Sequence, residues 1–386
     1  MTKRTITGID LGTQTTRVAV GEYRKGAKIP RIIGTGTSES KGLRHGYVIN
    51  PNEAIKGVLM AVREAERAAG VKIKRALIAI GGLSLESITS QGSTIISKAD
   101  GEITEIDIKA VIESSEENLK ITNKKIIHTI PLSFKIDGKE VMGRPLGMRG
   151  IKLEVKTMFI TSLEQHLNDL IQIIEEAGIE VEDIVASPVA ASFVTLNKQQ
   201  KTAGCILANI GSETVTTVVY ENNIPISLKV FPIGSTDITN DIALGFKIPL
   251  EEAEQAKLGK EIDSYPKKKL EDIIEARLSD IFELIESHLK KIGRNGLLPA
   301  GIVITGGGSG IATIEDLARA SLKLPSKIAE LESFNGNKNK IKDSAWAVAY
   351  GLTVLGNSYL SEDSESLRLV KNTKSNLTSW LKQFLP

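Results

Sequence analysis

The chain has 386 residues, of which 41% are hydrophobic and 25% are charged, and its formal net charge is +2. This composition is ordinary for a soluble globular protein of about two domains. A charge so close to zero gives no global electrostatic reason to bind nucleic acid, which we therefore exclude from the expected partners.

The chain carries one cysteine, Cys205, so no disulfide can form within it. This residue lies in the apolar run CILANI, where a small buried side chain is expected. With one cysteine and four scattered histidines, no zinc-binding spacing occurs. The N-terminus has no apolar signal core, and no run reaches the roughly 20 apolar residues of a membrane-spanning helix. We therefore expect a cytoplasmic protein.

Two segments 199 positions apart repeat one pattern: residues 9–22 read IDLGTQTTRVAVGE, and residues 208–221 read ANIGSETVTTVVYE. Each predicts an apolar strand, a turn of glycine and a hydroxyl residue, and a second strand rich in β-branched residues. The glycine permits close approach of the backbone to a ligand, and successive N–H groups in such a turn bind anions. One such hairpin is typical of simple chain reversal. A pair in register predicts two turns that bind a polyphosphate from opposite sides.

The residues of these two turns are the candidate ligands of phosphate and metal. Asp10 precedes the first turn and is suited to hold Mg²⁺ through water. The register places Asn209 at the same point of the second turn, so the predicted metal site comprises Asp10 and Asn209. The predicted phosphate contacts are Gly12, Thr13, Gln14, Gly211, Ser212 and Glu213.

Residues 45–160 predict a helix, a strand and then a small α+β unit. Apolar residues at Ile55, Leu59, Val62 and 65–69 predict the buried face of the helix, and a strand follows at 76–80. The stretch 84–160 has the pattern of a strand, a helix and a meander of further strands.

The segment IPLEEAEQAKLGK, residues 248–260, predicts a helix after Pro249. Glu254 and Lys257 lie three positions apart and therefore share one face of this helix. They form either an exposed ion pair or a contact to a nucleoside, and we take both as candidate adenosine-binding residues.

The segment GIVITGGGSGIATIEDLARASL, residues 301–322, predicts a buried strand, a glycine turn and a helix from about Ala312. Without side chains, a turn of three glycines lets a base or ribose lie against the backbone near a helix N-terminus. The alternatives are an ordinary strand-to-helix turn and a dinucleotide-binding fold, whose G-x-G-x-x-G spacing is not met. The candidate adenosine-binding glycines are Gly306, Gly307 and Gly308.

In this order, the two hairpins and the glycine turn resemble the ATPase fold shared by actin, Hsp70 and sugar kinases. Helices rich in small residues, at 186–196 and 343–356, fit the helices that cross between the halves of that fold. The runs PLGMRGIKLEV, GEITEIDIKAVIE and PIGSTDITNDIALGFKIPLEEAEQAKLGK closely resemble FtsA, the actin-like bacterial cell-division family.

This resemblance extends from about residue 5 to the C-terminus and implies an α/β fold class. Specifically, it implies an actin/Hsp70-like fold of two duplicated lobes, with a small SHS2-like α+β insert in the first lobe and a C-terminal amphipathic helix. The implied divisions are a first-lobe core (1A) at 1–83, 161–202 and 335–356, an inserted subdomain (1C) at 84–160, a second-lobe core (2A) at 203–234 and 297–334, a second-lobe subdomain (2B) at 235–296, a linker at 357–375 and a membrane-targeting helix at 376–386.

The last ten residues, LTSWLKQFLP, support a membrane-targeting helix independently. Their large apolar residues recur at helical spacing and form one face. The segment is too short to span a bilayer or to be a stable helix alone in water, so we expect it to fold as it binds the lipid interface. The alternative is docking onto the body of the protein or a neighbour. The predicted membrane contacts are Leu377, Trp380, Leu381, Phe384 and Leu385.

The resemblance implies a protein that binds ATP and Mg²⁺, polymerises on the cytoplasmic face of the membrane at the division septum, and tethers the FtsZ ring there. Implied partners are the C-terminal peptide of FtsZ through subdomain 2B, other copies of the chain, anionic lipid and other division proteins. A basic cluster in and near 2B would complement an acidic peptide: Lys247, Lys260, Lys267, Lys268, Lys269, Arg277, Lys290, Lys291 and Arg294.

Enzymatic activity is left open by the sequence. Many relatives carry an acid where this chain has Asn209, and a neutral amide adds no charge to hold Mg²⁺ or orient a water. ATP binding is therefore expected with weak or no hydrolysis, and Glu213 is the nearest candidate for a base. Two other functions stay open: an actin-like assembly platform of type IV pili, and a sugar or acid kinase of the same superfamily.

Overall fold

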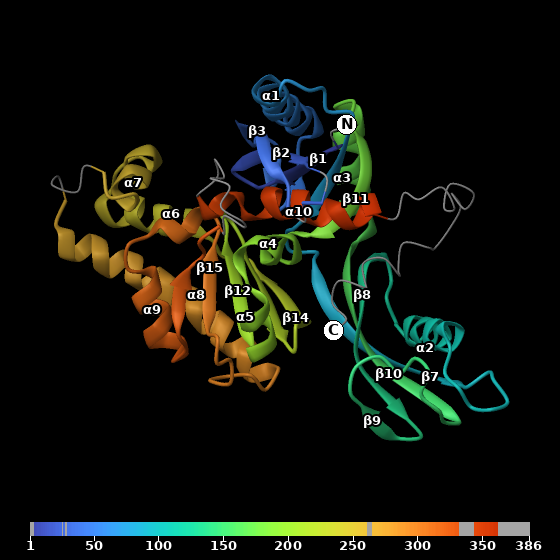
Figure 1. Cartoon of the computed structure of the whole chain (residues 1–386). Coiled ribbons are helices and arrows are strands. Elements are labelled where there is room, and N and C mark those ends of the chain that lie inside the picture. Colours follow the sequence, from blue (N-terminus) through green and yellow to red (C-terminus); the bar gives the residue numbers. More distant parts are fainter. Residues whose placement is uncertain (1–3, 25, 28, 261–264, 332–342, 362–386) are drawn as a thin grey trace.

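The computed structural model describes residues 4–24, 26–27, 29–260, 265–331 and 343–361. Two five-stranded sheets of the same design form the centres of two lobes (Figure 1). The first sheet has the order β11-β6-β1-β2-β3 and the second the order β14-β13-β12-β15-β16. The first comprises β1 (Arg4–Leu11), β2 (Thr15–Tyr23), β3 (Arg31–Glu39), β6 (Arg75–Ile80) and β11 (Glu180–Ala186). The second comprises β12 (Cys205–Ile210), β13 (Val215–Glu221), β14 (Ile224–Phe231), β15 (Ile302–Thr305) and β16 (Ser326–Ile328).

In each sheet three consecutive strands form an antiparallel meander, and two later strands add in parallel to its first strand. The repeat seen in the sequence is therefore a repeat of topology. The two sheets place the duplicated turns at the corresponding ends of β1 and β12.

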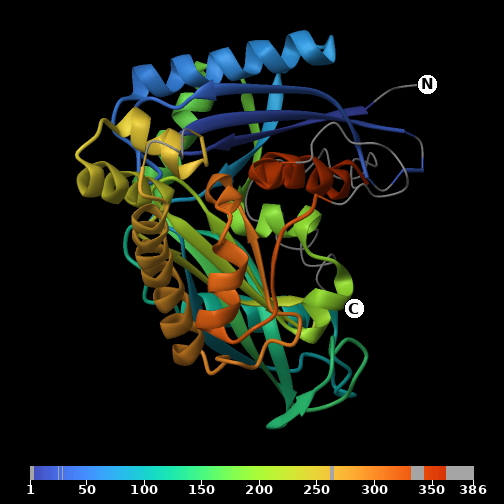
Figure 2. The ribbon, with the colours of Figure 1, turned by 90° about the vertical axis from the view of Figure 1, so that its left-hand side faces the viewer.

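Helices cover both faces of the first sheet. α1 (Pro51–Ala69) and α3 (Glu164–Glu176) lie on one face, and α10 (Ala347–Ser361) lies on the other, as Figure 2 shows from the side. α10 crosses α4 (Ser187–Thr195), which packs against β12 and β13 of the second sheet. The second lobe is completed by α5 (Lys198–Ala203), α6 (Ser235–Phe246), α7 (Leu250–Lys257), α8 (Lys267–Lys291) and α9 (Ile314–Leu322).

The crossing of α4 and α10 depends on a glycine. A Cβ built on Gly351 would lie 1.9 Å from the carbonyl oxygen of Ala190, so the two backbones approach more closely than any other residue allows. Ala190, Ala191 and Ala349 are fully buried beside it. The small residues of these two helices thus bring the lobes together where the sequence predicts a crossing.

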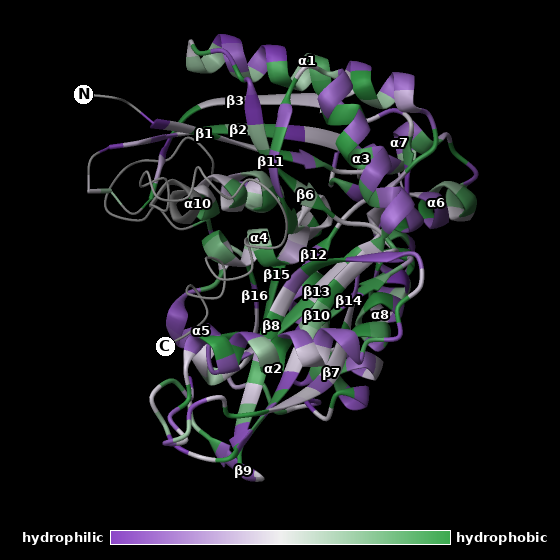
Figure 3. Cartoon of the chain, turned by 90° about the vertical axis from the view of Figure 1, so that its right-hand side faces the viewer, coloured by the Kyte–Doolittle hydropathy of each residue, from purple (hydrophilic) through white to green (hydrophobic). Residues whose placement is uncertain are grey.

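The buried face of α1 agrees with the predicted one in part, because Val62 and Ala65 are buried and Ala69 packs against the core. Ile55 and Leu59 are only half-buried, and α1 buries a face of smaller residues against β3. The physical reason lies in β3, because a Cβ on Gly36 would lie 2.0 Å from the carbonyl oxygen of Ala61. Two β3 glycines, Gly34 and Gly36, let the helix backbone lie almost on the sheet. Figure 3 shows hydrophilic and hydrophobic stretches alternating along α1 at the surface. The buried residues are Ala54, Gly57, Val58, Ala61, Val62 and Ala65.

The insert forms a separate four-stranded antiparallel sheet, in the order β7-β10-β8-β9, with one helix and a core of its own. Its elements are β7 (Glu86–Ile95), α2 (Glu105–Glu117), β8 (Lys124–Ile136), β9 (Lys139–Val141) and β10 (Lys152–Leu163). This is the predicted strand, helix and meander.

The outer edge of β7 is capped by side chains from α2 and the residue after it. The Asn118 side chain donates to the carbonyl of Gln91 at 2.9 Å, and the Ser93 N–H donates to the Ser114 hydroxyl at 3.3 Å.

No helix within the described ranges is both long and apolar enough to cross a membrane. The predicted membrane-targeting helix at 376–386, with Leu377, Trp380, Leu381, Phe384 and Leu385, lies outside the described residues, as does most of the linker.

Candidate functional site

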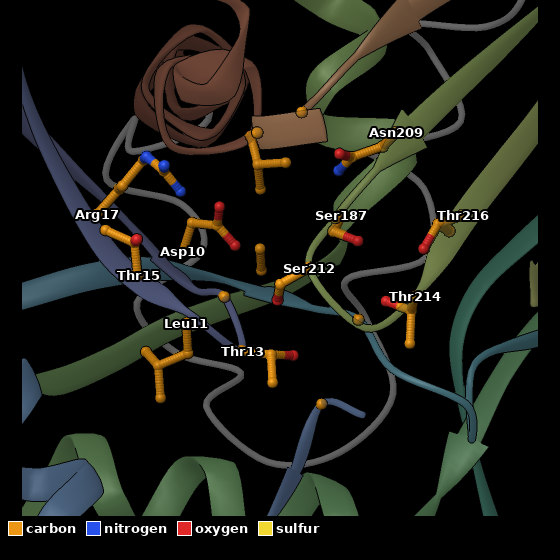
Figure 4. A pocket seen from close by; sticks show the side chains of 18 of the residues that line it. Asp10, Leu11, Thr13, Thr15, Arg17, Ser187, Asn209, Ser212, Thr214 and Thr216 are labelled. Carbon is orange, nitrogen blue, oxygen red and sulfur yellow. The ribbon is translucent and has the colours of Figure 1, made fainter. Parts of the chain in front are cut away.

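The two duplicated turns face each other across one pocket between the lobes (Figure 4). The space between the turns measures about 930 Å³, a volume that includes its open mouth. Asp10, Thr13, Asn209 and Ser212 all come to this space from the two lobes. Nine of the predicted site residues line it: Asp10, Gly12, Thr13, Gln14, Asn209, Gly211, Ser212, Gly306 and Gly307.

The two turns are built alike. A Cβ on Gly12 would lie 2.8 Å from the carbonyl oxygen of Thr15, and a Cβ on Gly211 would lie 2.9 Å from that of Thr214. Neither position accepts a side chain without moving the turn. The backbone itself therefore forms the pocket wall at both turns, as a phosphate site requires.

The charge of the two turns differs. In the first hairpin Asp10 pairs across the strands with Arg17; in the second, the equivalent pair is Asn209 and Thr216. All four residues line the pocket. Burial raises the pKa of Asp10 to about 6, and the charge of Arg17 acts in the opposite direction. The ionisable pair of the pocket thus belongs to the first lobe, and the second lobe supplies neutral groups.

The donor set at Asp10 fits Mg²⁺ that arrives with phosphate. Within the described ranges no three His, Cys, Asp or Glu side chains gather to hold a metal. Mg²⁺ in nucleotide sites is commonly held by one or two carboxylates, phosphate oxygens and water, which Asp10 and the pocket can accommodate. The Asn209 amide oxygen lies against Gly306, where a Cβ would come within 2.2 Å of it. Its role toward the metal stays a prediction.

The glycine turn is fixed to the crossing helices. Gly306 has a φ of +94°, and the 3-10 helix η2 (Gly307–Gly310) follows before α9 begins at Ile314, two residues later than predicted. The Ser309 hydroxyl lies 2.8 Å from the Ser344 hydroxyl, and the Thr305 hydroxyl donates to the Ser344 carbonyl, also at 2.8 Å. Ser344 begins η4 (Ser344–Trp346), which leads into α10. The turn is therefore attached to the start of α10 through Ser344.

The remaining predicted adenosine residues lie behind the pocket wall. Lys257 Nζ lies 2.7 Å from the Glu254 carboxylate, 2.9 Å from the Thr239 hydroxyl and 3.1 Å from the carbonyl of Ser235. The Lys257 side chain is only 5% exposed. A Cβ on Gly308 would lie 3.1 Å from the Cβ of the same Ser235. Glu254, Lys257 and Gly308 thus support the start of α6 beside the glycine turn, and direct contact with adenosine stays a prediction for them.

Glu213 also turns away from the pocket. Its carboxylate accepts the backbone N–H of His45, in the loop between β4 (Leu43–Arg44) and β5 (Tyr47–Val48) of the first lobe.

Other residues that line the pocket were not predicted from the sequence. Arg17 and Thr216 could have been found, because antiparallel pairing places them opposite Asp10 and Asn209. Ser187, His166 and the 81–82 turn carry no repeat or motif that marks them.

Two family models match the chain. The model described as cell division protein FtsA matches residues 206–351, and that of the SHS2 domain inserted in FtsA matches residues 82–161. Together they span more than half of the sequence: the first covers the second lobe and runs into α10, and the second covers the insert of the first lobe.

Individual curated proteins and solved structures are also similar to this chain. The cell division protein FtsA of Pseudomonas aeruginosa is 28% identical over 373 residues, covering 91% of this chain and 89% of that protein. Among solved structures, the PilM–PilN type IV pilus biogenesis complex is 17% identical with a TM-score of 0.69, covering 91% of this chain and 98% of that one. MreB5 of Spiroplasma citri bound to ADP is 14% identical with a TM-score of 0.53, covering 94% and 99%. These structures confirm the predicted fold class, and the second family model confirms the SHS2 insert; the C-terminal amphipathic helix stays a prediction.

Proposed function

Because the chain belongs to the FtsA family of cell-division proteins, we propose that it binds ATP with Mg²⁺ between its lobes and, so loaded, assembles on the cytoplasmic face of the membrane. As a member of that family it is an actin-like cell-division protein. The observation that carries the nucleotide proposal is the single pocket formed by two duplicated, glycine-containing turns. The solved MreB5 neighbour, with ADP bound, supports it.

In this proposal the two turns hold the phosphates through Gly12, Thr13, Gly211 and Ser212, and Asp10 faces the metal. Gly306 and Gly307 take the adenosine side, where a Cβ on Gly307 would meet nothing within 4 Å. Bound Mg²⁺ would neutralise phosphate charge, while Arg17 adds a cation from the chain itself.

Binding and hydrolysis are separate questions at this site. The second turn has the neutral Asn209, and the nearest acid, Glu213, is turned toward His45. We therefore expect ATP to act as a switch with slow turnover. The test measures ATP affinity by calorimetry and steady-state phosphate release in the same preparation. Brisk release by the wild type that is lost in Asn209→Ala would contradict this expectation.

Membrane attachment is proposed for the C-terminal segment. A single short amphipathic helix binds lipid weakly, so several copies on one polymer would bind far more tightly through avidity. Co-sedimentation with vesicles that contain anionic lipid compares the full chain with residues 1–375, with and without ATP. Leu381→Glu and Gln383→Glu form a matched pair, because each adds one negative charge, the first to the apolar face of the proposed helix and the second to its polar face. Only the first should reduce pelleting, and equal pelleting of the full and shortened chains would remove the tail from the mechanism.

Subdomain 2B is proposed to bind the C-terminal peptide of FtsZ at the division septum. Arg277 makes two bonds with Asp241, at 2.7 and 3.0 Å, and Arg294 pairs with Glu221, so these two arginines are engaged within the fold. Lysines such as Lys267, whose side chain is 75% exposed, remain as candidate contacts for an acidic peptide. Peptide titration into the full chain tests this. The PilM–PilN likeness keeps a pilus platform as the second candidate, and no peptide affinity at high micromolar concentration would favour it.

We propose that copies of the chain contact one another through the far end of the insert. Other division proteins are proposed to bind the same region. Large apolar side chains are exposed on the insert and on the α6–α7 region, as expected of surfaces that become covered. Light scattering with ATP and vesicles, on the wild type and Ile151→Glu, tests the insert. The exposed residues include Ile95, Ile106, Met142, Ile151, Leu244, Leu250 and Leu258.

A further inference from the structure

His166 sits at the root of the inserted sheet, where the chain enters and leaves it. It belongs to α3, is 3% exposed and lines the pocket. Its Nδ1 lies 2.5 Å from the hydroxyl of Ser84, just before β7, and that hydroxyl lies 2.7 Å from the hydroxyl of Ser162 near the end of β10. Its Nε2 lies 2.8 Å from the carbonyl oxygen of Gly46. One imidazole therefore joins both connections of the insert to the β4–β5 hairpin.

The direction of these bonds follows from the chemistry of the partners. The Gly46 carbonyl can only accept, so Nε2 carries the proton and Nδ1 is the acceptor. The Ser84 hydroxyl then donates to Nδ1 and accepts the hydroxyl of Ser162. Burial lowers the pKa of His166, which keeps the ring in the neutral form that this arrangement requires.

The hairpin continues the connection into the second lobe. The His45 N–H donates to the Glu213 carboxylate at 2.5 Å, and His45 Nδ1 lies 3.2 Å from the Glu213 carbonyl. Glu213 stands in the second turn between two pocket residues. His45 and Gly46 have φ values of +48° and +85°, and a Cβ on Gly46 would lie 2.5 Å from the Cα of Gly82. The hairpin is thus fitted closely against the 81–82 turn and has little freedom to absorb a movement.

A separate contact supports the side of the insert. The Ser87 hydroxyl lies 2.9 Å from both the N–H and the carbonyl of Leu228 in β14, the edge strand of the second sheet. The insert is therefore held at its root by the first lobe and at its side by the second. A relative movement of the lobes must turn the insert or break one of these supports.

We propose that His166 is a positioning residue that couples the nucleotide in the cleft to the orientation of the inserted subdomain. A change at the Glu213 turn passes through His45 and Gly46 to His166, and from there to Ser84 and Ser162 at the root of the insert. The inference rests on the proposed nucleotide binding. Coupling of this kind is reciprocal, so a partner that holds the insert in one orientation changes nucleotide affinity by the same factor.

The experiment measures the distance between two labels. The chain's one cysteine, Cys205, is fully buried, so labels can be placed at Lys109→Cys in α2 and Asp316→Cys in α9, whose side chains are 67% and 83% exposed and lie outside the apolar surfaces proposed for assembly. We expect the distance to change when a non-hydrolysable ATP analogue and Mg²⁺ saturate the full chain. The change should shrink at least about two-fold in Ser84→Ala and in Ser162→Ala, because the bonds at the root are lost.

Analogue affinity gives a second readout. Ser84→Ala and Glu213→Gln should each weaken binding by about three-fold or more, within the usual range for single changes along a coupling path. If both act along one path, the double variant loses no more than the larger single loss, so the effects are non-additive. Fully additive losses would contradict the proposal.

Ser115→Ala is the matched control. Its buried hydroxyl bonds to the Ile112 carbonyl at 2.7 Å and to Thr157 at 2.9 Å within the insert, away from its root. It should keep the full change in distance. An unchanged distance in the wild type with analogue bound, or a full change in Ser84→Ala and Ser162→Ala, would overturn the proposal. If calorimetry shows that the wild type binds no analogue, the proposed function fails, and this inference fails with it.

Discussion

Replacing Gly351 by alanine tests how the two lobes are joined. In a helix interior, Gly→Ala normally raises stability by up to about 1 kcal/mol. Here the new Cβ would lie 1.9 Å from the carbonyl oxygen of Ala190, so α4 and α10 must separate. Overpacking of this kind costs about 1–3 kcal/mol, and a backbone atom cannot rotate out of the way as a side chain can. After the helix-propensity gain is subtracted, we expect a net loss of up to about 2 kcal/mol, and weaker nucleotide binding because both helices reach the pocket.

Gly57→Ala is the control in α1. Its Cβ would lie 3.4 Å from the Glu39 carbonyl, an ordinary contact, so the helix-propensity gain of up to about 1 kcal/mol should be realised. The assay is urea unfolding of the ligand-free proteins, followed by circular dichroism, with analogue affinity measured by calorimetry. The two variants should shift the midpoint in opposite directions. Equal stability of Gly351→Ala and Gly57→Ala would refute the reasoning that the glycine is required by the crossing.

Three further predictions concern buried polar groups. Burial raises the pKa of Asp10 from 3.8 to about 6, so the native state loses stability as the pH rises through this window. The unfolding free energy of Asp10→Asn should therefore exceed that of the wild type by about 2–3 kcal/mol at pH 8 and by little near pH 4. The same variant should lose Mg²⁺-dependent nucleotide affinity in calorimetry. The buried ring of His128 accepts the Ala186 N–H, and burial lowers the pKa of His128 from 6.5 to about 3. As the pH falls, the unfolded chain therefore takes up a proton at this histidine before the native state does. Urea unfolding should show a loss of about 2 kcal/mol of stability between pH 7.5 and pH 5 in the wild type, and a smaller loss in His128→Gln. Lys257→Met should cost about 2–4 kcal/mol by thermal or urea unfolding, because it leaves Glu254 without its buried partner.

Each of these has a contrary outcome. A pH-independent effect of Asp10→Asn would show that its carboxyl is not held in a costly ionised form. An identical pH slope in His128→Gln would assign the acid sensitivity to other groups. Full stability of Lys257→Met with reduced analogue affinity would return Lys257 to direct contact with the nucleoside.

The repeat of the two hairpins could be recognised in the sequence because the same tight turn between two strands occurs twice. Each turn brings its backbone within 3 Å of where a Cβ would stand, at Gly12 and at Gly211, so each needs a glycine, and a small hydroxyl residue follows it in both. The order of the elements and the division into lobes with an insert follow from that repeat and from ordinary strand and helix patterns. Those patterns depend on neighbouring residues in the sequence and survive without knowledge of the packing.

What the sequence could not give depends on partners far away along the chain. The buried face of α1 was predicted only in part, because its closest contacts are set by glycines of β3, and nothing in α1 itself shows how closely a sheet approaches. His166 and Ser187 reach the pocket from separate elements without any local pattern. The inward or outward direction of Glu213 depends on the N–H of His45, which is 168 positions away.

The capped edge of β7 has a consequence for any polymer that uses the insert. The Gln91 carbonyl and the Ser93 N–H are already bonded to Asn118 and α2, so a second subunit that added a strand to this edge would have to displace both bonds. Contacts between copies through the insert would therefore rely on its side chains and loops more than on a continuous sheet.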